Sequence, residues 1–171
     1  MKRILCMLLL ISMILCLWGC QQKDSKIVLH FYYPRENYGY DEQQGRFFQQ
    51  SAQEELRNDI VYQSSQKVID EYLLGPLDPA LSNPFPTGTQ LVSLRVEGAV
   101  LYMTLTDQLS ELTGIPLIMA CACLARTAIM LTDSVQVQIR CESAMLDGGQ
   151  VIIMNSETVI FDDPIIIEEN Q

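Results

Sequence analysis

The clearest local pattern in the chain is Val68-Ile69-Asp70-Glu71-Tyr72-Leu73-Leu74-Gly75-Pro76. Its apolar residues recur at helical spacing and gather on one face, whereas its acidic residues fall on the other. Ser64 or Ser65 can cap the start of such a helix with a side-chain oxygen. Gly75 accepts the left-handed conformation that ends a helix, and Pro76 cannot continue one. The pattern therefore predicts an amphipathic helix with one buried face.

A hairpin and a second helix are predicted downstream. Residues 90–96 and 99–106 are predicted to be β-strands on either side of Glu97-Gly98, a two-residue turn signal. Pro116 suits the first position of a helix that we expect over residues 115–132. This second helix is apolar on almost every side, which is typical of a helix buried on more than one side. We expect it to lie on the sheet and also to meet the first helix or a partner protein.

Three further segments complete the predicted fold. Residues 27–33 form a β-rich, almost continuously apolar run closed by Pro34, so we expect a strand at a central position. Residues 135–141 alternate apolar and polar, as a half-buried strand does, and a turn leads from there into a last strand at 151–155. Residues 35–53 indicate only a loop with a short strand or a helical turn. The order predicts an α+β domain with two helices packed on one face of an antiparallel or mixed sheet.

The N-terminus has the parts of a secretory signal. Met1-Lys2-Arg3 is a short basic start, residues 4–17 are apolar almost throughout, and Leu17-Trp18-Gly19-Cys20 follows. A basic start, an apolar stretch and a small residue at the cut site together indicate export. We therefore expect residues 1–19 to be a signal peptide.

Cys20 is the predicted lipid attachment site, and residues 20–26 are a polar tether. The order Leu17-Trp18-Gly19-Cys20 is similar to the bacterial lipobox, although Trp18 is bulkier than the residue usual at its position. The alternative is an uncleaved anchor helix, but the apolar stretch is shorter than the roughly 20 residues that span a bilayer. We therefore expect a protein that is held by lipid on the outer face of the cytoplasmic membrane.

The charge balance argues against nucleic acid as a partner. The chain has 11 basic and 21 acidic residues, a net charge of −10. Loss of residues 1–19 removes Lys2 and Arg3, so nine basic residues remain against 21 acidic ones and the charge becomes −12. Binding to phosphates or to anionic lipid depends on Lys and Arg. A two-chain lipid on Cys20 would hold the protein durably without a basic patch.

Three cysteines remain for the domain once the signal peptide is removed and Cys20 carries lipid: Cys121, Cys123 and Cys141. Because free cysteine packs as a small hydrophobe, we expect buried thiols. A bridge from Cys141 to Cys121 or Cys123 is the alternative in an oxidising compartment. His30 is the only histidine and no paired Cys-x-x-Cys occurs, so we expect neither a metal site nor a cofactor.

No known catalytic motif is evident in the chain. The nucleophile elbow, the phosphate-binding loop and the zinc-protease helix motif are all absent. His30 lies in mid-strand, where we assign it a structural role. Asp107 follows a strand and serves either as an active-site acid or, as we favour, as a turn or cap residue. The adjacent acidic pairs are expected to diverge and to lie on solvated surface: Glu54-Glu55, Asp70-Glu71 and Asp162-Asp163.

An aromatic cluster leaves two interpretations open. Its members are Tyr32, Tyr33, Tyr38, Tyr40, Phe47 and Phe48. They either line a ligand groove or, as we favour, pack in the core with an aromatic rim. The first interpretation would make the protein a ligand-binding sensor.

The chain resembles the GerMN domain of the sporulation and spore germination family. The resemblance rests on the helix that ends in Leu73-Leu74-Gly75-Pro76, the loop Pro86-Thr87-Gly88-Thr89 before the strand Leu91-Val92-Ser93-Leu94, and the strand from Gly98 to Thr106. The second helix with Arg126-Thr127 continues the match, which covers roughly residues 27–160.

The chain also departs from the family pattern. The family usually has Ser where Thr106 stands, and residues 35–60 match poorly. Cys121-Ala122-Cys123 and the insert at 141–146 are unusual. One copy of the domain fits here, whereas the spore protein has two.

The resemblance implies a compact fold of helices against a sheet, similar to the ring-building motif of secretion systems. It places the domain at residues 27–161, before an acidic tail at 162–171. Family members are extracytoplasmic, often lipoproteins, and serve as assembly or interaction modules; no catalytic residues carry over. We therefore expect a non-enzymatic module of the cell envelope, in sporulation or germination. Its expected partners are the membrane, through the lipid, and envelope proteins or further copies of the chain, but no small-molecule ligand.

Overall fold

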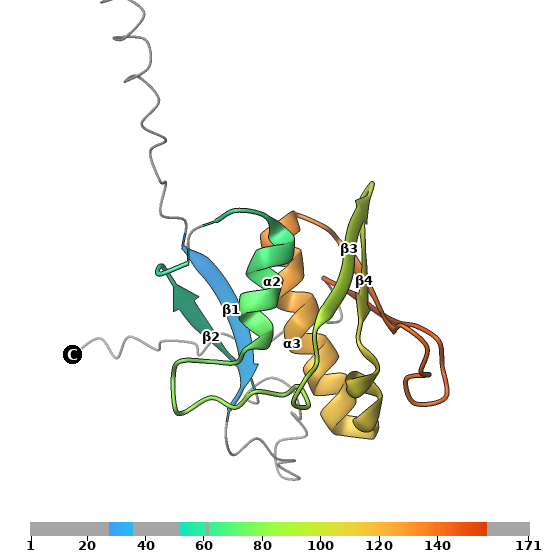
Figure 1. Cartoon of the computed structure of the whole chain (residues 1–171). Coiled ribbons are helices and arrows are strands. Elements are labelled where there is room, and N and C mark those ends of the chain that lie inside the picture. The colour runs from blue at the N-terminus through green and yellow to red at the C-terminus, as the bar shows by residue number, and fades with distance from the viewer. Residues whose placement is uncertain (1–27, 36–51, 61, 157–171) are drawn as a thin grey trace, which may run out of the picture.

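The computed structural model describes residues 28–35, 52–60 and 62–156 (Figure 1). The predicted signal peptide, Cys20, the tether and the acidic tail lie outside these residues. The elements in chain order are β1 (Leu29–Pro34), β2 (Ala52–Arg57), α2 (Ser65–Leu73), β3 (Leu91–Glu97), β4 (Val100–Leu105), a 3-10 helix (Asp107–Glu111), α3 (Gly114–Thr132), β5 (Gln136–Cys141) and β6 (Ile152–Asn155). The predicted α+β class is confirmed.

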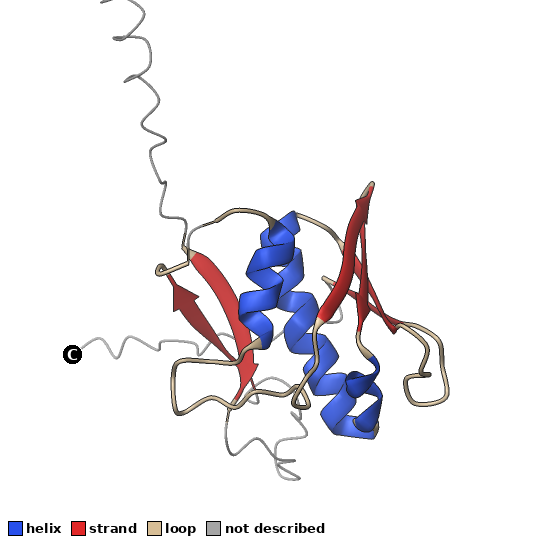
Figure 2. Ribbon diagram, in the orientation of Figure 1, coloured by secondary structure: helices blue, strands red, loops and turns tan. Residues whose placement is uncertain are grey.

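The larger sheet has four strands in the order β3-β4-β5-β6. β4 and β5 are parallel and are connected through α3, whereas the other neighbours are antiparallel, so the sheet is mixed. Alternate residues of β4 and β5 are at most 1% exposed: Leu101, Met103, Leu105, Val137 and Ile139. The helices lie on this face of the sheet, and the core lies between the two layers (Figure 2).

The β3–β4 hairpin turns one residue later than predicted. Glu97 pairs with Val100, so the two turn residues are Gly98 and Ala99. Gly98 has a φ of +61°, which glycine adopts without steric cost, and it therefore takes the first turn position.

Strands β1 and β2 form a separate two-stranded antiparallel sheet on the other side of the helices (Figure 1). The central position predicted for residues 27–33 is therefore wrong, because β2 is the only strand paired with β1 in the described part of the chain. The apolar character of β1 has a different cause. Helix α3 packs along the strand, and Leu29, Phe31 and Tyr33 are at most 5% exposed. β2 begins at the end of the segment in which the sequence indicated only a loop with a short strand or a helical turn.

Helix α2 confirms the amphipathic pattern that was read from the sequence. Ser64 is the N-cap, and its hydroxyl oxygen accepts a hydrogen bond from the Lys67 N–H at 3.3 Å. The apolar face is buried: Val68, Ile69, Tyr72 and Leu73. Gly75 has a φ of +104°, and a Cβ there would lie 3.0 Å from the Asn83 side chain. Glycine is therefore required both by the backbone conformation and by the close approach of Asn83.

Helix α3 is buried on more than one side, as its composition predicted. It contacts β1 on one side and β5 and β6 on the other. Pro116 is its third residue instead of its first, a position still within the first turn, where no backbone N–H is needed. By length and composition alone α3 could cross a membrane, yet 61% of its most apolar window is buried within the protein. Such a composition also belongs to the core helix of a soluble domain, and the burial is what identifies α3 as one.

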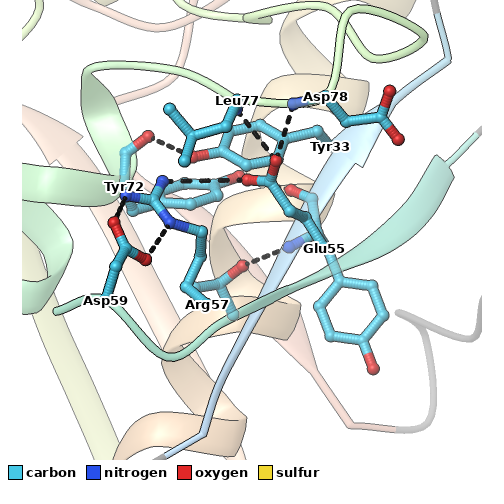
Figure 3. A network of polar contacts seen from close by, with 9 residues as sticks. Tyr33, Glu55, Arg57, Asp59, Tyr72, Leu77 and Asp78 are labelled. Atoms are coloured by element: carbon cyan, nitrogen blue, oxygen red, sulfur yellow. Dashed lines mark hydrogen bonds and ion pairs between the residues drawn. The ribbon is translucent and has the colours of Figure 1, made fainter.

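Two tyrosines join the small sheet to the helices. The rings of Tyr33 and Tyr72 stack with centroids 4.7 Å apart (Figure 3). The Tyr33 hydroxyl donates to the main-chain oxygen of Tyr72, and the Tyr72 hydroxyl donates to that of Tyr32, both at 2.7 Å. Tyr32, whose main-chain oxygen accepts this second bond, also donates its own N–H to Thr127 Oγ1 of α3 at 3.0 Å. Burial raises the pKa of Tyr33 and Tyr72, so both hydroxyls stay protonated donors.

We predict that Tyr72→Phe lowers the free energy of unfolding by about 1–3 kcal/mol, because it leaves the buried Tyr32 carbonyl without its donor. Urea denaturation of the purified protein measures this change. Tyr62→Phe is the matched control, since Tyr62 is 41% exposed and its hydroxyl meets only Ser65 at the surface. Equal stabilities of the two variants would contradict the role assigned to the Tyr72 hydroxyl.

Candidate functional site

His30 belongs to a small polar cluster on β1 and β2. Its Nδ1 lies 2.6 Å from Glu54 Oε1, and the Tyr32 hydroxyl donates to the same oxygen at 2.9 Å. Glu54 pairs with Tyr32 across the ladder between the two strands. The three side chains therefore tie the strands of the small sheet together, which fits the structural role predicted for His30.

A groove of about 210 Å³ lies beside this cluster, between β1, α2 and α3. Its walls are mainly apolar, and His30 and Thr127 are among its few polar members. The Thr127 oxygen already accepts the Tyr32 N–H, and no Ser or Cys is among the described residues that line the groove. The other hydroxyl of the groove walls, that of Tyr62, contacts Ser65. Among the described residues that line the groove, His30 is therefore a possible base without a Ser or Cys nucleophile beside it.

Asp107 holds a loop in place. Its Oδ1 accepts hydrogen bonds from the N–H groups of Ser143 and Ala144, at 2.9 and 3.0 Å. These two bonds lower the pKa of Asp107 below its ordinary value. The loop, residues 142–150, is closed further along by reciprocal main-chain bonds between Leu146 and Gly149. The local turn or cap contact that we favoured for Asp107 is therefore wrong: Thr106 is the N-cap of the 3-10 helix, and the Asp107 side chain instead binds a loop that is more than 30 residues further along the chain.

We predict that Asp107→Ala speeds amide exchange at Ser143 and Ala144, because both N–H groups lose their acceptor. Asp107→Asn should restore part of the protection, since its amide oxygen can still accept. In the unmodified protein both bonds should be complete above pH 3.8 and should weaken only as the pH falls through the lowered pKa. Hydrogen exchange and amide shifts measured by nuclear magnetic resonance test this; unchanged exchange in the Ala variant would contradict it.

A buried ionic network involves Glu55 and Arg57 of β2 (Figure 3). Glu55 Oε1 accepts the N–H groups of Leu77 and Asp78, each at 2.8 Å, and its other oxygen lies 3.8 Å from Arg57 Nη1. Arg57 donates two hydrogen bonds to the Asp59 carboxylate, from Nε at 2.7 Å and from Nη2 at 2.8 Å. These bonds lower the pKa of Asp59 to about 2. The network fastens the loop after α2 to the small sheet.

The surface position predicted for the Glu54-Glu55 pair is wrong for Glu55, whose side chain is only 10% exposed. The two carboxylates do diverge, because neighbours on a strand point to opposite faces. The Glu55 carboxylate points inward and contacts two main-chain amides and an arginine. Asp70 and Glu71 lie on the exposed face of α2, as predicted. Asp162-Asp163 lies outside the described residues.

We predict that Glu55→Ala lowers the free energy of unfolding by about 1–3 kcal/mol, because it removes two charge-assisted bonds and leaves Arg57 without one of its carboxylates. Glu71→Ala removes the same charge from an exposed helix position and should change stability by less than about 0.5 kcal/mol. Parallel denaturation curves of the two variants test the difference. A loss no larger for Glu55 than for Glu71 would show that the network does not stabilise the fold.

The three cysteines of the domain and Tyr33 of the aromatic cluster contribute mainly to packing. Cys121, Cys123 and Cys141 are free and buried, as the favoured interpretation predicts, and burial raises the pKa of Cys121 to about 12. Tyr33 lies in the core, so it cannot line an open ligand groove. The other members at 38, 40, 47 and 48 lie outside the described residues. No group of three potential metal ligands occurs in the part of the chain that the structure describes.

The outer face of the four-stranded sheet, which points away from the helices, carries polar side chains. We define this outer face by its outward residues on three neighbouring strands: Ser93, Arg95, Tyr102, Thr104, Gln138 and Arg140. They line a hollow of about 690 Å³, and Val151, after the 142–150 loop, borders it. Arg140 Nε donates to Thr104 Oγ1 at 3.0 Å, and the Arg95 guanidinium lies 4.8 Å from the centre of the Tyr102 ring.

The fold is that of an α+β domain in which two helices lie between a mixed four-stranded sheet and the two-stranded sheet of β1 and β2. The chain belongs to the sporulation and spore germination family, whose Germane domain model matches residues 30–147. That match lies within the 27–161 segment to which the sequence resemblance assigned the domain.

Solved structures with the same fold include two from Bacillus subtilis. One is the first GerMN domain of the sporulation protein GerM, with a TM-score of 0.51, 13% identity, and coverage of 75% of this chain and 95% of that one. The other holds the tandem GerMN domains of GerM, with a TM-score of 0.55, 14% identity, and coverage of 85% of this chain and 50% of that one. No curated protein sequence matches this chain. At such low identity the likeness shows the fold, and half of the tandem structure corresponds to one copy.

Proposed function

We propose that this protein is a membrane-anchored, extracytoplasmic lipoprotein whose GerMN domain is a non-enzymatic interaction or assembly module of the cell envelope. Its setting would be sporulation or germination, as for the relatives in its family. The observation that carries the proposal is the order of the chain: a lipobox-like sequence ends at Cys20, and the family domain begins about ten residues later.

The distance from the anchor to the domain is short. Residues 21–27 separate Cys20 from the first described residue, Val28, and seven residues span at most about 25 Å when fully extended. A domain on such a tether would work close to the membrane surface. Because the net charge is negative, the lipid and not the protein surface would supply the attachment.

The use of the polar side chains also favours an interaction module over an enzyme. Glu55, Asp107 and Tyr72 hold loops, strands and helices together, each through hydrogen bonds to main-chain groups. His30 pairs with Glu54, and nothing in the groove beside it supplies a nucleophile among the described residues. The sensor alternative has less support, since Tyr33 is in the core and the groove is smaller than the roughly 300 Å³ at which ligand pockets begin.

We predict that mass spectrometry of the membrane fraction finds a mature N-terminus at Cys20 that carries a diacylglyceryl thioether. Cys20→Ser should abolish the lipid and release the protein from membranes, because no other thiol stands at the cleavage site. Cys16→Ser is the matched control, since Cys16 lies within the segment that is removed, and its product should be processed normally. An unacylated protein in the cytosol would refute the anchored arrangement.

Assembly is tested on the same material. Crosslinking in intact membranes should join the protein to envelope proteins or to further copies of itself, and light scattering at high and low concentration should distinguish these two results. A strict monomer without any crosslinked partner would refute the interaction role, even with the lipid in place.

A further inference from the structure

We propose that the outer face of the four-stranded sheet docks an extended acidic segment of a partner protein, whose two carboxylates bind Arg95 and Arg140. The proposal rests on the interaction function above and names the surface and the chemistry of the partner. It starts from a sheet that the described residues cover on one side only.

The outer face is built as rows across the strands. Register places Ser93, Thr104 and Arg140 in one row, and Arg95, Tyr102 and Gln138 in the next. Beyond Gln138, the row ends at Ile153 of β6, which is 56% exposed. The outer face therefore combines a polar floor with an exposed apolar residue at its border.

A hydrogen bond holds Arg140 in one orientation and leaves its two terminal nitrogens available as donors. Its Nε donates to the hydroxyl of Thr104, a residue that is only 7% exposed, at 3.0 Å. In the described part of the chain, its two terminal nitrogens have no hydrogen-bond or ion-pair partner. A guanidinium that is fixed through Nε presents its remaining donors as a fork, which is the geometry that binds a carboxylate through two hydrogen bonds.

Arg95 is oriented in a similar way by a neighbouring residue of β4. Its guanidinium stacks at 4.8 Å over the Tyr102 ring, and Nη1 lies 2.7 Å from Glu97 Oε1. Both members of this ion pair are more than half exposed, so the pair itself contributes little and does not close the site. The other donors of Arg95 remain available for a second carboxylate.

The two residues of β4 on which the guanidiniums rest have the spacing of alternate residues in an extended peptide. Arg95 rests on Tyr102 and Arg140 on Thr104, and these are successive outward residues of β4, about 7 Å apart along the strand. Side chains at i and i+2 of an extended peptide point to one side with the same separation of about 7 Å. A segment that lies along β4 with acids two residues apart would thus bring one carboxylate to each guanidinium.

Charge complementarity favours an acidic protein segment over a lipid or nucleic-acid surface. The chain as a whole carries a net charge of −10, which opposes any broad polyanion. Two arginines within a hollow of about 690 Å³ can still attract discrete carboxylates, because close pairing depends on local charge. The outer face is therefore selective for spaced acids.

A titration tests the docking face. The full-length protein, purified from membranes in detergent, is titrated at low salt against a short labelled peptide with Glu-Val-Glu at its centre. Two control peptides carry Gln-Val-Gln, or two adjacent Glu residues. We expect the Glu-Val-Glu peptide to bind about tenfold more tightly than either control, the size of a charge-assisted contact.

Variants assign the binding to the two arginines. Arg95→Met and Arg140→Met should each weaken Glu-Val-Glu binding by about fivefold or more, as the loss of one ionic contact predicts. Lys67→Met removes the same charge from the exposed side of α2 and should leave binding unchanged. Circular dichroism checks that all three variants remain folded, as expected for substitutions at exposed positions.

Three results would overturn the proposal. These are equal binding of all three peptides, binding that persists in both arginine variants, and binding that appears only after the acids at 162, 163, 168 and 169 become amides. The last result would assign the outer face to the chain's own C-terminal segment. The lipid on Cys20 and the crosslinking are independent of this titration, so the docking face can fail while the proposed function stands.

Discussion

The attachment of both helices to one edge of β1 holds the two layers of the described structure together. A strand with one neighbour leaves a row of main-chain N–H and C=O groups unpaired along its other edge. Here the N–H of Tyr32 is bonded by Thr127 of α3, and its C=O by Tyr72 of α2. Buried groups of this kind are costly without partners, so one residue of β1 determines where both helices lie. The side chains of Thr127 and Tyr72 thus make the hydrogen bonds to Tyr32 that a second neighbouring strand would otherwise make.

This arrangement determines which surface is left for function. With both helices between the sheets, the inner faces of β4 and β5 become part of the core, and no element of the described residues covers their outer faces. The buried polar groups, such as Glu55, are used to hold segments together. What remains for a partner is the polar outer face, together with the loop that Asp107 holds beside it.

Several parts of the fold and of its candidate site could be predicted because their signals are local. The helix before Gly75 followed from apolar spacing and from a stop that only glycine satisfies, and the buried thiols followed from composition. The isolation of β1 could not be predicted, since an apolar strand has the same sequence whether strands or helices cover it. The surface position predicted for Glu55 was wrong for a similar reason, because its hydrogen-bond partners Leu77 and Asp78 are more than 20 residues away in the sequence.

The order and type of most elements, the resemblance to the family and the character of the two helices could be predicted from the sequence alone. These depend on periodicity, capping and turn chemistry within a few residues. The tertiary structure alone decided that the chain forms two sheets and that Asp107 binds a loop, and it brought Arg95 and Arg140 together on one face. Those facts depend on pairing between residues that are distant in the chain. Such pairing depends on which surfaces are buried together, a choice that no single segment encodes.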